Sequence, residues 1–297
     1  MTVAMPLAEL VTGIASYIYR AVFARFTDPS ANFLLSIGFY PAVALVGWMV
    51  SRVLRKPPAK MTRAILVSVG SSFGIFLLNQ IFYPVLDHGT EPVHAFYKSL
   101  HVPHVPESAW TGVPLVFAII AGVIAVDFAN YWAHRAMHWK WIWPIHAIHH
   151  SDPVVRPPTT LRVHVLELVM MSVAYVFFVS WLSLPKASFA PIVIVMLLHN
   201  QYVHLDVDWT HGPLKLVIAS PRFHRWHHAD VKEAHGKNLA NLLPIWDWLF
   251  GTYYEGGECK ARLGAEGVPE NDVVKLVLFP FSEWARMLRA LVKRQPS

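Results

Sequence analysis

Long runs of apolar residues recur along the chain, and charged residues seldom interrupt them. Five runs approach the length of about 20 residues that a helix needs to cross a bilayer. They cover residues 33–50, 65–86, 113–133, 165–184 and 189–203. The pattern predicts an all-α fold, a polytopic membrane bundle of about four to five spans.

Two of these runs are separated by only four residues, 185–188, so they predict a helical hairpin. The second run of the pair is short for a full crossing, and a re-entrant pair that never crosses is the alternative. Residues 7–26 mix Glu9, Arg20 and Arg25 with apolar side chains. That mixture favours an interfacial amphipathic helix over a further span.

The charges between the runs predict the orientation in the membrane. The first loop contains five basic residues, whereas residues 87–112 contain only Lys98. Because cytosolic loops carry an excess of Lys and Arg, the first loop is expected in the cytosol. Counting crossings from there places His134, and everything after His204, on the same cytosolic side. In a bacterium this membrane would be the inner one.

Composition agrees with a membrane protein and excludes several other classes. Apolar residues make up 55% of the chain and charged residues 15%, against about 45–50% and 25% in soluble domains. The net charge of +6 comes from basic clusters beside apolar runs, which argues against a nucleic-acid partner. The single Cys259 excludes an internal disulfide and a thiolate-rich metal site.

Histidines provide the candidate chemistry. Of seventeen in the chain, thirteen lie between His134 and His235. His134 and His138 are four residues apart, so a helix presents both on one face. Two HxxHH triplets follow. A lone histidine is usually a solvated or core residue, but this combination of motifs favours metal binding. If each ion takes about four to five nitrogen ligands, the histidines suffice for two ions. The triplets are His146, His149 and His150, then His224, His227 and His228.

The segments DFANYWAHRAMH, HAIHHSD, SPRFHRWHHA and NLLPIWDWLFGTYY, within residues 127–254, resemble the bacterial branch of the fatty acid hydroxylase and sterol desaturase superfamily. The resemblance implies a membrane-embedded enzyme with two Fe ions that uses O2 to hydroxylate or desaturate fatty acyl chains, sterols, sphingolipids or ether lipids. It favours iron over zinc, although zinc is possible on isolation. Imidazole ligands alone leave the metal open.

The resemblance implies that the eight histidines of the HxxxH and HxxHH motifs are metal ligands. It also implies a further ligand on the hairpin, for which we favour His204 over His199. His164, accompanied by Glu167, resembles a family position that serves as a ligand or as a neighbour of one. Asp127 and Asn130 precede His134 by seven and four residues, so they are expected to orient a ligating imidazole or to bond between helices.

No nicotinamide, flavin or phosphate-loop motif occurs in the sequence, so the electrons are expected from a separate donor, a ferredoxin or a cytochrome b5-type protein with its reductase. The substrate is expected to be a membrane lipid. A desaturase with the same site, a zinc-dependent lipid hydrolase and a metal transporter are the competing interpretations. The predicted organisation is an N-terminal membrane region (1–112), a catalytic region (113–255) and a C-terminal membrane-surface helical tail (256–297).

Overall fold

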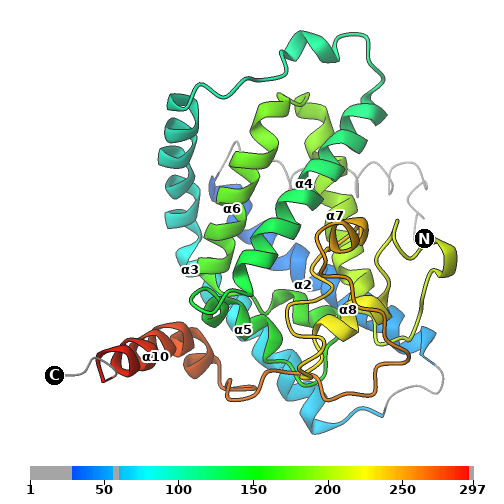
Figure 1. Ribbon diagram of the computed structural model, residues 1–297, viewed down its shortest axis with the longest axis vertical. Coiled ribbons are helices and arrows are strands. Elements are labelled where there is room, and N and C mark those ends of the chain that lie inside the picture. The colour runs from blue at the N-terminus through cyan, green and yellow to red at the C-terminus, as the bar shows by residue number, and fades with distance from the viewer. Residues whose placement is uncertain (1–28, 56–59, 294–297) are drawn as a thin grey trace, which may run out of the picture.

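The computed structural model describes residues 29–55 and 60–293 as an assembly of helices (Figure 1). Within those residues no β-strand forms, and the extended pairing is limited to an isolated bridge between Ala229 and Leu263. The expectation of an all-α fold is therefore confirmed. The α-helices are α2 (Pro29–Leu54), α3 (Arg63–Ser99), α4 (Leu115–Met137), α5 (Trp143–His150), α6 (Val165–Val179), α7 (Phe189–Val203), α8 (Pro221–His227), α9 (Ile245–Leu249) and α10 (Val273–Val292).

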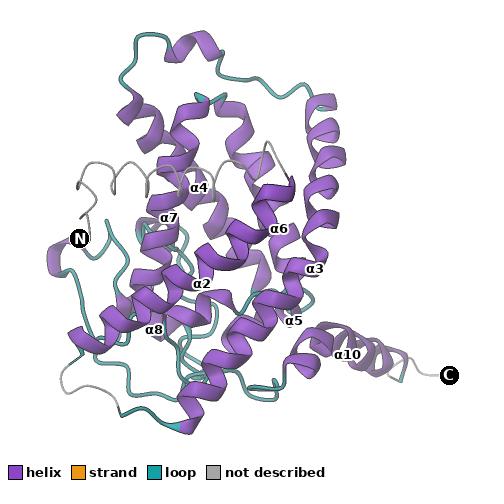
Figure 2. Cartoon of the chain, turned by 180° about the vertical axis from the view of Figure 1, so that it is seen from behind, coloured by secondary structure: helices purple, strands orange, loops and turns teal. Residues whose placement is uncertain are grey.

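Helix α4 lies at the centre of the bundle and packs against both α6 and α7, while α3 packs against α6 (Figures 1 and 2). Gly122 of α4 permits the close approach of α7, because a Cβ at that position would lie 2.2 Å from Cδ1 of Ile192. Small residues at such contacts are typical of membrane helices, whose association depends on close packing. The buried core between these helices consists of Ala118, Leu182, Leu184, Ile192 and Met196.

Three helical segments are long and apolar enough to cross a membrane, namely Arg63–Phe82, Leu115–Met137 and Val165–Leu182. They coincide with three of the five apolar runs. The other two runs form shorter helices within the described residues: the apolar part of α2 is Gly38–Leu54, and α7 has 15 residues. The expected turn between the last two runs is present, with Ser183 in the left-handed conformation. The amphipathic segment expected at residues 7–26 lies outside the described residues.

A cap of short helices and irregular chain covers one end of the bundle. Helices α5 and α8 lie at this end, at the bottom of Figure 1. Each begins with a proline in its first turn, where a missing N–H costs nothing. Ser220 caps α8 by accepting a hydrogen bond from the backbone N–H of Phe223 at 3.2 Å. These signals start the two helices that carry the HxxHH triplets.

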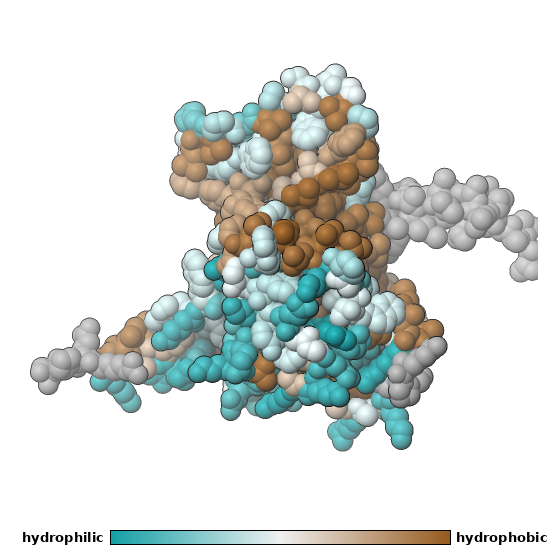
Figure 3. All heavy atoms as spheres, turned by 45° about the vertical axis from the view of Figure 1, so that its right-hand side comes forward, coloured by the Kyte–Doolittle hydropathy of each residue, from teal (hydrophilic) through white to brown (hydrophobic). Residues whose placement is uncertain are grey.

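The surface follows the same division. In Figure 3 hydrophobic residues gather around the bundle, and hydrophilic residues gather around the cap below it. Many large apolar side chains of the bundle are exposed, including Phe117, Ile120 and Leu198. An exposed apolar belt of this extent suits a bilayer as its surroundings.

Candidate metal centre

The histidine motifs lie at the ends of helices that meet beneath the bundle. His134 is in the last turn of α4, and His138 is its C-terminal capping residue. Helix α5 carries one triplet, and α8 with its capping residue His228 carries the other. His204 caps the C-terminus of α7. Four helices therefore direct imidazoles toward one region.

The nine histidines form two groups, and in each group one potential ligand atom per residue lies within 4.8 Å of all the others. The four histidines of the second group are buried, and those of the first are buried or half-buried. Such a division matches two ion sites. The first group is His134, His138, His146, His150 and His227, and the second is His149, His204, His224 and His228.

In the first group the Nε2 atoms of His134 and His146 are 2.9 Å apart. The Nε2 atoms of His138, His150 and His227 are buried and have no hydrogen-bond partner among the described residues. Two nitrogens that share one ion at about 2.1 Å each lie roughly 3.0–3.4 Å from one another. These nitrogens are therefore suited to bind a metal cation, which would be the partner that the described residues do not provide.

Contacts outside the first group orient its rings. Nδ1 of His134 lies 2.6 Å from the carbonyl oxygen of Leu239, and Nδ1 of His227 lies 2.8 Å from that of Lys237. A carbonyl oxygen only accepts, so each Nδ1 carries the hydrogen and each Nε2 presents its lone pair inward. This is the tautomer that a metal ligand requires.

His146 is oriented by a carboxylate. Its Nδ1–H donates to Oε1 of Glu167 at 3.0 Å, and both side chains are buried. A carboxylate in this place fixes the ring and raises the basicity of the opposite nitrogen. The sequence indicated Glu167 only as a companion of His164, so this role was missed. The available signal was an acidic residue at the start of a strongly apolar run.

The second group is linked through consecutive imidazole contacts. Nε2 of His204 lies 3.1 Å from Nε2 of His224 and 3.4 Å from that of His149, and Nε2 of His224 lies 3.1 Å from that of His228. Nδ1 of His204 donates to the carbonyl oxygen of Asn200 at 2.7 Å, which leaves its Nε2 free to bind a metal. The separations again match nitrogens that share one ion.

Burial keeps these imidazoles neutral. Burial, followed by repulsion from neighbouring imidazoles, lowers the pKa of His150 and His228 well below 6.5. Burial also lowers the pKa of His204 to about 4, against a smaller opposite effect of its hydrogen bond to Asn200. Neutral imidazole is the form that binds a metal ion. The site is thus prepared for a cation near neutral pH.

The contacts of Asp127 differ from the expected hydrogen bond to a ligating imidazole. Its carboxylate accepts hydrogen bonds from the backbone N–H groups of Leu242 and Leu243, at 2.8 and 2.9 Å, and from Nε1 of Trp246 at 3.0 Å. It holds the segment that follows Leu239, whose carbonyl oxygen contacts His134. Its link to the imidazole is therefore indirect.

Asn130 lies on the same helix and also contacts a neighbour other than an imidazole. Its Oδ1 accepts a hydrogen bond from the Tyr175 hydroxyl of α6 at 2.7 Å. This is the inter-helix bond that was expected as the alternative. Asn130 therefore ties α4 to α6 within the bundle.

The two other candidate histidines lie outside both groups. Nδ1 of His164 caps α6 by accepting a hydrogen bond from Leu166 N–H at 3.2 Å, and its Nε2 lies 3.2 Å from the carbonyl oxygen of Val277. His199 is buried and packs against the ring of Tyr202. The structure brings His204, and not His199, into the second group.

Comparison with known proteins gives a family match over the same part of the chain. Residues 119–252 match the family model described as fatty acid hydroxylase. That range contains both histidine groups and Glu167. No solved structure matches the chain.

Curated relatives carry names of lipid-modifying enzymes. The ornithine lipid hydroxylase OlsE of Rhizobium tropici is 29% identical over 185 residues, which cover 62% of this chain and 55% of that protein. The human alkylglycerol monooxygenase is 30% identical over 219 residues, 72% of this chain and 46% of that protein. A very-long-chain aldehyde decarbonylase, GL1-6 of Oryza sativa subsp. indica, is 23% identical over 155 residues, 48% of this chain and 24% of that protein. The chain thus spans about half the length of the first two relatives.

Proposed function

The chain belongs to the fatty acid hydroxylase family, and on that premise we propose that it is a membrane-bound enzyme with two iron ions that uses O2 to hydroxylate a C–H bond of a lipid. One observation carries the proposal: two histidine groups, of five and four residues, lie together at one end of an apolar helix bundle. Paired metal ions are suited to the joint activation of a small molecule. The bundle provides the apolar surroundings that a lipid requires.

The two groups divide the nine histidines between the ions. We assign the first ion to the group that contains His134 and the second to the group that contains His204. Nitrogen ligands of this kind suit iron, zinc and copper. The family resemblance favours iron. No thiolate competes, because the single Cys259 lies in a separate cluster with Val155 and Ala229.

A bound iron pair would supply the activation of O2 and the oxidising power for an unactivated C–H bond. The chain contributes the geometry. Backbone carbonyls hold the Nδ1–H of His134 and His227, and Glu167 holds that of His146, so each ring is fixed before metal binds. Burial of the site excludes water, which protects the reaction from side products.

The orientation proposed from loop charge places the metal centre on the cytosolic face, in the inner membrane if the source is bacterial. The substrate then enters from the bilayer along the helices that end at the site. A separate electron donor, a ferredoxin or a cytochrome b5-type protein with its reductase, approaches from the water. The lipid and the electron donor therefore approach the metals from different sides.

Helix α10 supports the proposal that residues 256–297 form a tail on the membrane surface, beside a membrane region at 1–112 and a catalytic region at 113–255. Its buried Leu276 packs against Ile75 and Ile148, which anchors the first half of the helix near α5. The second half lies to the side of the bundle (Figure 1). Along the whole helix, exposed apolar residues recur at the spacing of one helix face, and basic residues lie among them toward its C-terminal end. The apolar residues are Leu278, Phe281, Leu288, Leu291 and Val292, and the basic ones are Arg286, Arg289 and Lys293.

The test is O2 uptake by the detergent-purified protein after reconstitution with ferrous iron and a reductant, in the presence of membrane lipid extract. We expect uptake that depends on lipid, and a product heavier than its substrate by one oxygen. The His149→Ala variant should abolish uptake, whereas His235→Ala, which changes an exposed histidine outside both groups, should retain it. A product lighter by two hydrogens would point to desaturation. Tightly held zinc without uptake would contradict the proposal and favour hydrolysis.

A further inference from the structure

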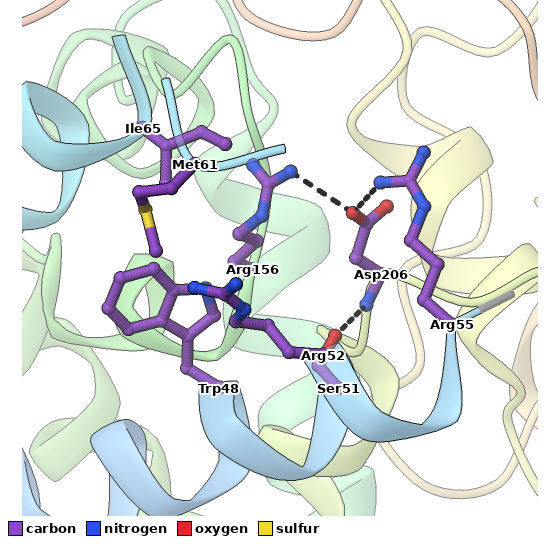
Figure 4. Close-up of a pocket in the computed structure, with 8 residues that line it drawn as sticks. All are labelled: Trp48, Ser51, Arg52, Arg55, Met61, Ile65, Arg156 and Asp206. Carbon is purple, nitrogen blue, oxygen red and sulfur yellow. Dashed lines mark hydrogen bonds and ion pairs between the residues drawn. The ribbon is translucent and has the colours of Figure 1, made fainter. Parts of the chain in front are cut away.

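A cluster of arginines surrounds one carboxylate at the end of α2. Asp206 accepts a charge-assisted hydrogen bond from Arg55 through Oδ2, and Nη2 of Arg156 lies 3.1 Å from the same oxygen (Figure 4). Nη1 of Arg225 lies 3.2 Å from Oδ1. The backbone N–H of Asp206 donates to Oγ of Ser51 at 2.9 Å, which fixes the carboxylate against α2.

Arg55, Arg156 and Asp206 line a small hollow that we call the arginine pocket, which has a volume of about 10 Å³ and is partly open to solvent. Arg52 also lines it (Figure 4) and is exposed. Asp206 contacts three guanidinium groups, and Arg52 lines the pocket beside them, so four positive charges gather around one negative charge and three are left over. The pocket is lined by Trp48, Ser51, Arg52, Arg55, Met61, Ile65, Arg156 and Asp206.

A second carboxylate near Arg156, that of Asp152, does not remove this excess. Asp152 accepts hydrogen bonds from the hydroxyls of Ser68 at 2.7 Å and Thr159 at 2.5 Å, and it lies near the fully buried Arg162 as well as Arg156. Arg156 itself is 10% exposed. Positive charge in a partly enclosed place is costly unless an anion accompanies it. A guanidinium group matches the oxygens of phosphate or carboxylate in shape and charge.

The other walls of the arginine pocket are apolar. Trp48, Met61 and Ile65 face the arginines across it (Figure 4). The adjoining outer surfaces of α2 and α3 expose Val53 and Leu66. Ile65 belongs to the candidate membrane span Arg63–Phe82. An amphiphile with an anionic head and an apolar tail meets both kinds of surface, whereas the small concave opening is less suited to a protein partner.

The arginine pocket also borders the metal centre. Asp206 follows His204 by two residues, and Arg225 follows His224 directly, and both histidines belong to the second group. Chain geometry keeps the Cα atoms of His204 and Asp206 within about 7 Å of each other. A headgroup held here therefore lies beside the second ion site.

We propose that the arginines at the opening of the arginine pocket bind the anionic headgroup of the lipid substrate and so position that lipid beside the second histidine group. That this lipid is a substrate rests on the proposed function above. Binding of the headgroup requires neither O2 nor turnover, so the two proposals can fail separately. If the headgroup binds but no O2 is taken up, only the proposed function is contradicted.

The experiment is native mass spectrometry of the delipidated, detergent-purified full-length protein with phosphatidylglycerol or with a diacylglycerol of the same acyl chains. We expect phosphatidylglycerol to bind at least about tenfold more tightly, which corresponds to about 1.4 kcal/mol, because a charge-assisted hydrogen bond is stronger than a neutral one. The double variant Arg52→Gln/Arg55→Gln should lose most of that preference. The matched control Lys60→Gln/Arg63→Gln removes the same charge from exposed positions outside the pocket and should keep it.

Three outcomes would overturn the proposal. The first is equal binding of the two lipids, or equal loss in the two double variants. The second is full displacement of phosphatidylglycerol by millimolar inorganic phosphate, which would identify a site for a free anion. The third is unchanged lipid binding with loss of reduction by an acidic ferredoxin in Arg52→Gln/Arg55→Gln, which would identify a donor-docking surface. Metal content, measured in parallel, should stay equal in the two double variants.

Discussion

His227 and His228 are neighbours in the chain, yet they belong to different histidine groups. His227 joins the group that contains His134, whereas Nε2 of His228 lies 3.1 Å from Nε2 of His224 in the other group. The end of α8 lies between them, because His227 is its last residue and His228 its capping residue. One short segment therefore supplies a ligand to each proposed ion.

This arrangement predicts separate losses of metal from two adjacent substitutions. His227→Ala should empty mainly the first group and His228→Ala mainly the second, so each variant should retain about one metal ion per chain. The measurement is metal content by mass spectrometry, and His235→Ala, which alters an exposed histidine, serves as the control. Full metal content in both variants would disprove the division into two groups.

Glu167 predicts a graded effect on metal affinity. Glu167→Ala removes the acceptor of the His146 Nδ1–H and should weaken metal binding by about 10–100-fold. Glu167→Gln keeps an oxygen that can accept this hydrogen bond and should lose less. Competition with a chelator measures both, and Glu107→Ala on an exposed turn is the control. Equal affinities for all three variants and the unaltered chain would remove the assigned role.

Gly122 predicts a cost of packing between α4 and α7. A side chain at that position meets Ile192 and Leu184, so Gly122→Leu should destabilise the protein by about 1–3 kcal/mol. Gly70 of α3 is exposed, and a Cβ there would meet nothing within 4 Å, so Gly70→Leu is the matched control. Thermal unfolding in detergent should show a lower midpoint for Gly122→Leu than for Gly70→Leu. Equal midpoints would contradict the close contact between the helices.

The buried histidines predict a loss of stability in acid for the metal-free protein. Their pKa values lie below 6.5 in the folded chain, and that of His204 is about 4. A histidine of the unfolded chain has a pKa of about 6.5. Between about pH 4 and pH 6.5 the unfolded chain therefore binds protons that the folded chain does not. The free energy of unfolding is highest above about pH 6.5 and decreases as the pH falls toward 4. Unfolding midpoints of chelator-treated protein at pH 7.5, 6 and 5 measure this. A constant midpoint would mean that the imidazoles are accessible to protons without unfolding.

The sequence predicted the parts of the site that depend on local spacing. Residues three and four apart share one side of a helix, so the HxxxH and HxxHH motifs already indicated which imidazoles lie together. Apolar runs likewise predicted the helices of the bundle. The shortness of residues 189–203 was visible as well, and α7 has the same bounds.

Contacts between distant segments could not be predicted in this way. Glu167 reaches His146 across 21 residues, and Arg55 reaches Asp206 across 151. Asp127 is buried, but its oxygens accept backbone hydrogen bonds from Leu242 and Leu243, about 115 residues later. The residue pattern of α4 cannot predict where that segment lies, because tertiary packing alone brings the segment to Asp127.

The central claim, that two histidine groups hold two metal ions, is tested most directly by the metal content of the purified full-length protein after anaerobic loading with ferrous iron and removal of excess metal. We predict about two iron ions per chain, and X-ray absorption should show nitrogen as the main ligand. One ion or none per chain, or a first shell dominated by oxygen or sulfur, would contradict the claim.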